Sequence, residues 1–221
     1  MLENEAKKLI VDIGRRMYEA GFVASNDGNI SIRLDDGSII ATPSGVSKGY
    51  MNEEMLIKID GDGNVLAGSG KVSSEIKMHL IAYKTNPDIN SVCHSHSPYA
   101  TSFASAEQPL DCTIIAESVL SLGSVPCIPY EELGTERVAL GIKPYLFSHG
   151  GLLMAHHGVV TWGKDIMQAY SRMESIEHLA RINLYSKLIG GGVSLRADEI
   201  AALEQMRSKF GIDYKKSPVY K

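Results

Sequence analysis

Cysteine is scarce in this 221-residue sequence, which has only Cys93, Cys112 and Cys127 and no CxxC pair among them. An odd number of separated thiols argues against a disulfide framework. We therefore expect reduced thiols and a cytoplasmic location. The opening segment MLENEAKKL carries acidic residues and no apolar region, so we expect no signal peptide.

Long apolar runs and an excess of positive charge are missing as well. No apolar run reaches the roughly 18 residues that are needed to span a bilayer. The 22 lysines and arginines are outnumbered by 26 aspartates and glutamates, which gives a net charge of -4, whereas nucleic-acid-binding domains are typically basic. We therefore expect neither a membrane nor a nucleic acid as a partner.

The sequence does contain enough apolar residues, 44% of the total, for one well-buried core. Apolar residues recur at helical spacing in some segments and alternate in others. Helices are expected over 2–20, 73–84, 97–104, 135–143, 165–189 and 198–210, and strands over 29–34, 38–42, 55–60, 65–68, 91–96, 125–130 and 151–158. Early hairpins, followed by strands that alternate with helices, predict one α/β (α+β) domain over residues 1–221 with a mainly antiparallel sheet.

Two histidines, His94 and His96, occupy alternate positions of the predicted strand 91–96. Because side chains alternate along a strand, both point to one face, whereas Cys93 points to the other. Two imidazoles on one face can share a metal ion, and a third from a later strand completes the three-histidine set of an open catalytic Zn²⁺ site. The pair therefore predicts a metal site, provided that a third histidine meets it.

The adjacent histidines His156 and His157 are the candidates for that third ligand. If they lie on a strand, only one of two neighbouring side chains can face the metal. His157 is better placed, because it adjoins Gly158 at the predicted strand end. A packing or supporting role is left for His156.

Glu75 stands in the first turn of the predicted helix 73–84. An acidic residue there complements the helix dipole and needs no further purpose. Alternatively, its carboxylate lies at the mouth of the metal site and binds the ion or moves protons. Both interpretations stay open on the residues alone. Isolated histidines are usually structural or solvated, and we expect this of His79, His149 and His178.

Three short segments combine glycine or small polar side chains: Gly28-Asn29, Ser44-Gly45 and Ser73-Ser74. Exposed backbone N–H groups at a helix start attract anions, and glycine lets the backbone approach a ligand closely. Each segment alone is also an ordinary turn or cap. An anion site is therefore a hypothesis that depends on the three segments meeting.

Six motifs occur in an order typical of a known family: GNISIR (28–33), TPSG (42–45), SSE (73–75), HSH (94–96), PYxxxGT (129–135) and AHHG (155–158). In this order they resemble the class II aldolases of the aldolase/adducin type, over nearly the whole chain. The resemblance is greatest to the L-fuculose-1-phosphate aldolases. It implies a three-layer α/β/α sandwich and a homotetramer with active sites at subunit boundaries.

The activity that the resemblance implies is Zn²⁺-dependent cleavage of a ketose 1-phosphate to dihydroxyacetone phosphate and an aldehyde. Enzymes of similar sequence include phosphosugar epimerases, dehydratases and decarboxylases, and these remain alternatives. The adducin head resembles the same fold, so a non-catalytic scaffold is a further alternative. Glu75 favours an aldolase, because the 4-epimerases resemble this motif with Asp in its place.

The resemblance also implies roles for individual residues. One Zn²⁺ per subunit is held by His94, His96 and His157, with Glu75 as a fourth ligand that leaves when substrate binds and then moves the proton. The phosphate of the substrate lies among six residues: Gly28, Asn29, Ser44, Gly45, Ser73 and Ser74.

The sequence departs from the family at the proton donor. Fuculose aldolases carry a tyrosine from a neighbouring subunit whose position falls near Ile115 or Thr113 here. A second family tyrosine aligns with Phe210, close to Tyr214 and Tyr220. The proton donor and the sugar are therefore left open.

Overall fold

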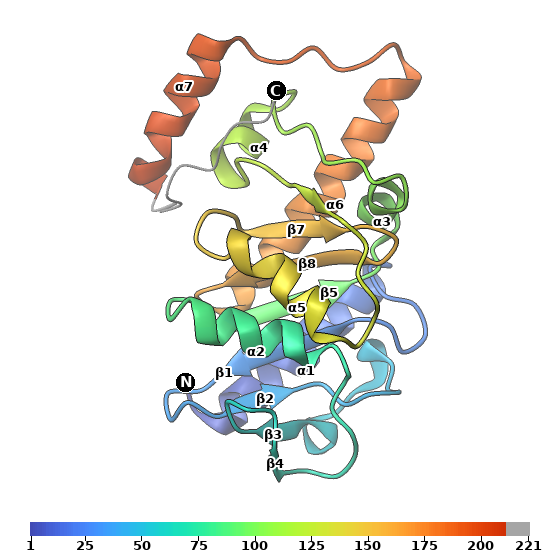
Figure 1. Ribbon diagram of the computed structural model, residues 1–221, viewed down its shortest axis with the longest axis vertical. Coiled ribbons are helices and arrows are strands. Elements are labelled where there is room, and N and C mark those ends of the chain that lie inside the picture. Colours follow the sequence, from blue (N-terminus) through green and yellow to red (C-terminus); the bar gives the residue numbers. More distant parts are fainter. Residues whose placement is uncertain (211–221) are drawn as a thin grey trace.

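The computed structural model describes residues 1–210, except for the side chains of Ser208 and Phe210. One sheet runs through the middle of the molecule, with helices on both sides (Figure 1). Its strands are β1 (Asn29–Arg33), β2 (Ile39–Ala41), β3 (Ile57–Ile59), β4 (Val65–Ala67), β5 (Ser91–Ser95), β6 (Cys127–Ile128), β7 (Gly151–Met154) and β8 (Gly158–Gly163). The described α-helices are α1 (Glu3–Glu19), α2 (Ile76–Thr85), α3 (Pro98–Ser105), α4 (Ala116–Ser121), α5 (Glu136–Ile142), α6 (Ile166–Leu188) and α7 (Ala197–Met206). Single turns of 3-10 helix are η1 (Lys48–Tyr50), η2 (Glu53–Met55), η3 (Lys143–Tyr145) and η4 (Arg207–Phe210).

The eight strands follow the order β4-β3-β2-β1-β5-β8-β7-β6. Every neighbouring pair is antiparallel except β6 and β7, which are parallel. The predicted mixed fold with a mainly antiparallel sheet is confirmed.

Two apolar cores lie on opposite faces of the sheet. Helices α1, α3 and α6 pack on one face, and α2 and α5 pack on the other, as Figure 1 shows. Strand β5 contributes to both, because Cys93 enters the first core and Val92 enters the second. This alternation confirms the predicted three layers, and it assigns the face of His94 to the side of α2 and α5.

Helix α1 illustrates why the sequence forms these layers. Its fully buried residues, Ala6, Ile10, Ile13 and Met17, recur three or four positions apart and make one apolar stripe. Gly21 follows with a φ of +73°, a left-handed conformation that favours glycine and ends the helix.

Some details of the predicted elements are wrong. The helix expected over 73–84 begins at Ile76, so Glu75 is its N-cap residue and does not lie in its first turn. The expected strand 151–158 stops at Met154, and a second strand, β8, begins at Gly158. The cause is His156, whose φ of +54° turns the chain between the two strands. His157 therefore lies in a tight turn and not on a strand. Helix α4 was not predicted either.

Within residues 1–210, no helix is long and apolar enough to cross a membrane.

Candidate metal centre

The antiparallel register of three strands determines where the candidate residues lie. The end of β5 pairs with the start of β1, where His94 is opposite Asn29. On its other side, β5 pairs with the start of β8, where Ser95 is opposite Val159. The end of β5 and the starts of β1 and β8, which are distant in sequence, therefore lie together at one end of the central strands.

The three predicted imidazoles meet at this end of the strands. The ring centroids of His94 and His157 are 4.7 Å apart, those of His94 and His96 are 5.0 Å apart, and those of His96 and His157 are 5.3 Å apart. Each ring offers one nitrogen, and these nitrogens all lie within 4.8 Å of one another. The structure thus brings together the three histidines that the sequence analysis predicted as metal ligands.

The hydrogen bonds of the imidazoles fit a bound cation. Nδ1 of His94 donates to the carbonyl oxygen of Val159 at 2.9 Å, so its Nε2 carries a lone pair. Nε2 of His94 and Nε2 of His96 are buried and have no hydrogen-bond partner. Burial lowers the pKa of His94 to about 3, which keeps the ring in the neutral form that binds metals.

Glu75 approaches the imidazoles from the start of α2. Its Oε1 lies 2.6 Å from Nε2 of His157, and its Oε2 lies 3.5 Å from Nε2 of His94. Burial alone would raise the pKa of Glu75, but the two imidazoles and a hydrogen bond from Asn29 outweigh burial and hold it well below its usual range. The side chain makes no capping hydrogen bond to α2. The carboxylate is therefore ionised and directed at the histidines.

Gly158 is a residue of this centre whose contacts the sequence did not reveal. A Cβ added at Gly158 would overlap the carbonyl oxygen of Ser95 and lie 2.9 Å from Cδ2 of His96 and 3.4 Å from Cε1 of His94. Only a residue without a side chain leaves room for the two rings.

Two neighbouring histidines take no part in the cluster. His79 is fully buried on α2, where its Nε2 donates to Oδ1 of Asn29 at 2.6 Å and its Nδ1 bonds to the hydroxyl of Ser31 at 2.7 Å. His156 points elsewhere and pairs with Glu107 at 3.0 Å. The expected structural role of His79 is confirmed, and His156 lies at the surface, away from the cluster.

The three segments predicted to bind an anion lie close to the same end of the strands. Nδ2 of Asn29 is 3.5 Å from the hydroxyl of Ser73, and the backbone N–H of Ser44 donates to Lys71 at 2.8 Å, beside that serine. Gly28 and Gly45 both have a positive φ, +72° and +75°. Ser74 and Ser44 are exposed.

The side chain of Asn29 has other partners. Its Nδ2 donates to Oε2 of Glu75 at 2.6 Å, and its Oδ1 accepts the hydrogen bond from His79. Asn29 therefore links a buried helix histidine to the carboxylate of the centre.

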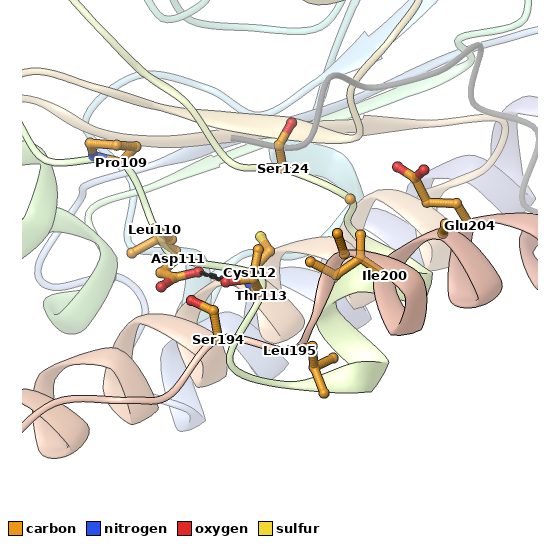
Figure 2. Close-up of a pocket in the computed structure, with 13 residues that line it drawn as sticks. Pro109, Leu110, Asp111, Cys112, Thr113, Ser124, Ser194, Leu195, Ile200 and Glu204 are labelled. Atoms are coloured by element: carbon orange, nitrogen blue, oxygen red, sulfur yellow. Dashed lines mark hydrogen bonds between the residues drawn. The ribbon is translucent and has the colours of Figure 1, made fainter. Parts of the chain in front are cut away.

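A cavity of about 710 Å³ lies elsewhere, between α7 and the segment before α4 (Figure 2). It includes Thr113, one of the positions expected for the missing tyrosine. The Thr113 hydroxyl donates to Asp111 at 2.6 Å, as Figure 2 shows. Ile115 directly precedes α4, Phe210 ends η4, and Tyr214 and Tyr220 lie outside the described residues.

Comparisons with known proteins agree with this geometry. The family model described as Class II Aldolase and Adducin N-terminal domain matches residues 8–184. The 5-deoxy-D-ribulose 1-phosphate aldolase of Bacillus thuringiensis is 34% identical over 213 residues, covering 95% of this chain and 97% of the relative. The 3-oxo-tetronate 4-phosphate decarboxylase of Haemophilus influenzae is 34% identical over 187 residues, covering 82% of this chain and 88% of the relative.

A solved structure of an L-fuculose 1-phosphate aldolase superposes with a TM-score of 0.86 at 27% sequence identity, covering 96% of this chain and 98% of that one. These named relatives are enzymes. The chain therefore belongs to the family of the class II aldolase and adducin N-terminal domain, and within it is a metal-dependent lyase.

Proposed function

We propose that this chain is a class II aldolase that cleaves a ketose 1-phosphate, similar to L-fuculose 1-phosphate, into dihydroxyacetone phosphate and an aldehyde. The supporting observation is that three imidazoles meet, that a carboxylate contacts two of them, and that two buried imidazole nitrogens have no hydrogen-bond partner. Neutral imidazole nitrogen is a preferred ligand of Zn²⁺. We propose one Zn²⁺ per subunit, held by His94, His96 and His157, with Glu75 as the fourth ligand before substrate binds.

The chemistry divides between the ion and the carboxylate. A bound divalent cation supplies a Lewis acid that stabilises the negative charge developing on the substrate when the C3–C4 bond breaks. Glu75 is proposed to take and return the proton at the carbon where that bond breaks. Its contacts at 2.6 Å and 3.5 Å to His157 and His94 support this role, because they hold the carboxylate next to the imidazoles that would bind the ion.

The substrate phosphate is proposed to bind at the loops beside the histidines, with Gly28, Asn29, Ser44, Gly45, Ser73 and Ser74. The start of α2 supplies backbone N–H groups and a positive dipole end for an anion. The Nζ of Lys48 donates to the carbonyl oxygens of Val46 at 2.6 Å and Asn26 at 3.0 Å, so one buried cation joins two of these loops. Burial lowers its pKa to about 8.

Two wider expectations belong to the same proposal. The homotetramer depends on the family resemblance, and a mass measurement in solution that gives four subunits supports it. The cytoplasmic location depends on the cysteines, which are all free thiols: Cys93, Cys112 and Cys127.

A decarboxylase acting on a phosphorylated 3-oxo acid is the second candidate, because a relative with 34% identity over 187 residues bears that activity in its name. Loss of carbon dioxide from a 3-oxo acid leaves negative charge on a carbon next to a carbonyl group, as carbon–carbon cleavage by an aldolase does. The same cation and carboxylate therefore suit both reactions.

Product analysis distinguishes the two candidates. Purified protein is incubated with a panel of ketose 1-phosphates and phosphorylated 3-oxo acids, and dihydroxyacetone phosphate and carbon dioxide are both measured. We expect dihydroxyacetone phosphate, zinc equal in amount to subunits, and loss of turnover with a chelator that added Zn²⁺ reverses. Release of carbon dioxide alone selects the decarboxylase, and turnover that survives full metal removal overturns both candidates.

A further inference from the structure

Asp27 lies beside the histidine cluster but belongs to none of the six sequence motifs from which the site was predicted. It is in the turn before β1, and its Oδ2 is 3.3 Å from Nδ1 of His96. The side chains are 41% and 33% exposed, respectively, so the pair lies at the open side of the cluster.

This contact determines which nitrogen of His96 faces the cluster. With Nδ1 directed at the carboxylate, Nε2 is the atom left over, and it is buried without a hydrogen-bond partner. His94 is arranged in the same way, with Nδ1 on the carbonyl of Val159 and Nε2 unpaired. The two imidazoles thus direct Nδ1 at different groups: in His94 it donates to a neutral carbonyl at 2.9 Å, and in His96 it lies 3.3 Å from an anionic carboxylate.

His96 needs such support more than His94 does. His94 lies within β5 and is fully buried, so the sheet fixes its ring. His96 follows the last residue of β5, and a third of its side chain is exposed. A ring beyond the strand end depends on a side-chain partner for its orientation.

The turn that carries Asp27 is itself held in place. Its backbone N–H donates to the carbonyl of Ala24 at 2.9 Å. The carbonyl of the preceding residue, Asn26, accepts a hydrogen bond from Lys48, whose side chain is almost completely buried. The carboxylate is therefore presented to His96 from a fixed backbone.

We propose that Asp27 is a positioning residue that fixes the orientation and tautomer of His96 and so strengthens the binding of the divalent cation. The proposal depends on the metal role of His96 given above. A carboxylate that accepts from the outer nitrogen of a metal-bound imidazole makes the ring a stronger donor, and loss of such a partner typically weakens metal binding about 10- to 100-fold.

The test measures Zn²⁺ affinity directly, by competition with a chromophoric chelator, for full-length wild type, Asp27→Asn and Asp27→Ala. We expect binding about 10- to 100-fold weaker in the variants, with Asp27→Ala the weaker of the two because it also loses the acceptor oxygen. Circular dichroism confirms that each variant is folded. Asp27→Asn keeps the size of the side chain, so it removes the charge without opening a cavity.

The matched control is Glu107→Gln, which changes a histidine–carboxylate pair outside the cluster, His156 and Glu107 at 3.0 Å. Its Zn²⁺ affinity should equal that of wild type. Side-chain ¹H–¹⁵N spectra of the metal-free proteins add a second readout, since His96 should be a single Nδ1–H tautomer in wild type and a mixture in Asp27→Ala.

The outcomes separate this proposal from the proposed function. Tight Zn²⁺ binding by wild type with equal affinity in both Asp27 variants overturns the role of Asp27 and leaves the metal site intact. Failure of wild type to bind Zn²⁺ overturns the proposed function, and the role of Asp27 with it.

Discussion

The histidine cluster and the cavity beside α7 are two hollows of opposite character. The cavity measures about 710 Å³, and its residues Thr113 and Asp111 hydrogen-bond to each other. The hollow lined by Glu75 and His157 measures about 10 Å³, yet the ring of His157 adjoins those of His94 and His96, whose buried Nε2 atoms have no hydrogen-bond partner. Ligand sites are often the largest pocket of a protein, but here the buried imidazole nitrogens without partners and the cavity of about 710 Å³ lie in different places.

The difference shows how to recognise a reacting centre. A buried polar atom without a partner destabilises the folded state, so a group of them in one place requires an explanation. The proposed metal ion would supply one at the histidine cluster, because it would pair with the Nε2 atoms of His94 and His96. The cavity contains no comparable group among its described lining residues, since Thr113 is already paired.

The largest expected effect comes from Glu75→Gln. The amide keeps the size of the side chain but cannot accept a proton as a carboxylate does, so we expect turnover to fall by about 10²- to 10⁴-fold. Bound metal, measured by elemental analysis, should remain because three imidazoles still hold it. The matched control is Glu204→Gln at the cavity, which should leave turnover unchanged. Equal losses in the two variants would remove the distinction between the two hollows.

A smaller effect is expected at His79, which supports the centre through Asn29. Burial lowers its pKa from 6.5 to about 4. Between these pH values the unfolded chain binds a proton that the folded protein does not. The contribution of His79 to the free energy of unfolding is therefore fully present above pH 6.5 and is lost as the pH falls towards 4. A pKa lowered this far corresponds to about 3 kcal/mol in the free energy of unfolding.

Urea unfolding of metal-free protein at pH 7 and pH 4.5 measures this effect. His79→Gln should lose less stability than wild type between the two pH values, since glutamine does not titrate. His178→Gln changes an exposed histidine on α6 and should follow wild type. If His79→Gln also follows wild type, the buried network does not carry the pH dependence.

Gly158→Ala tests how closely the rings are packed. The added Cβ would overlap the Ser95 carbonyl and press on His96, and overpacking of this kind typically costs about 1–3 kcal/mol. We expect a lower thermal midpoint together with weaker Zn²⁺ binding. Gly61→Ala is the control, because a Cβ there meets no atom within 4 Å and its φ is not positive. Normal Zn²⁺ binding by Gly158→Ala would show that the cluster has spare room.

The sequence predicted the parts of this centre that depend on local geometry. His94 and His96 share a face because strand side chains alternate, and the structure confirms it. The turn at His156 was missed, because a positive φ is uncommon in residues other than glycine, and the enrichment of histidine there is too weak a signal to place a turn. The contacts of Asp27 and Gly158 were also missed, since they are made with residues more than sixty positions away.

The smallest expected effect concerns Thr113, where the sequence left a family proton donor open. Its hydroxyl donates a hydrogen bond to Asp111 at 2.6 Å. Thr113→Val should therefore reduce the free energy of unfolding by about 1 kcal/mol and leave turnover unchanged. Thr113→Ser keeps the hydroxyl and should match wild type in both measurements. If turnover falls sharply in Thr113→Val and is restored in Thr113→Ser, the hydroxyl reaches the reacting atoms of an adjoining subunit. The cavity would then be one wall of the active site in the assembled enzyme, and the contrast between the two hollows would hold only within a single subunit.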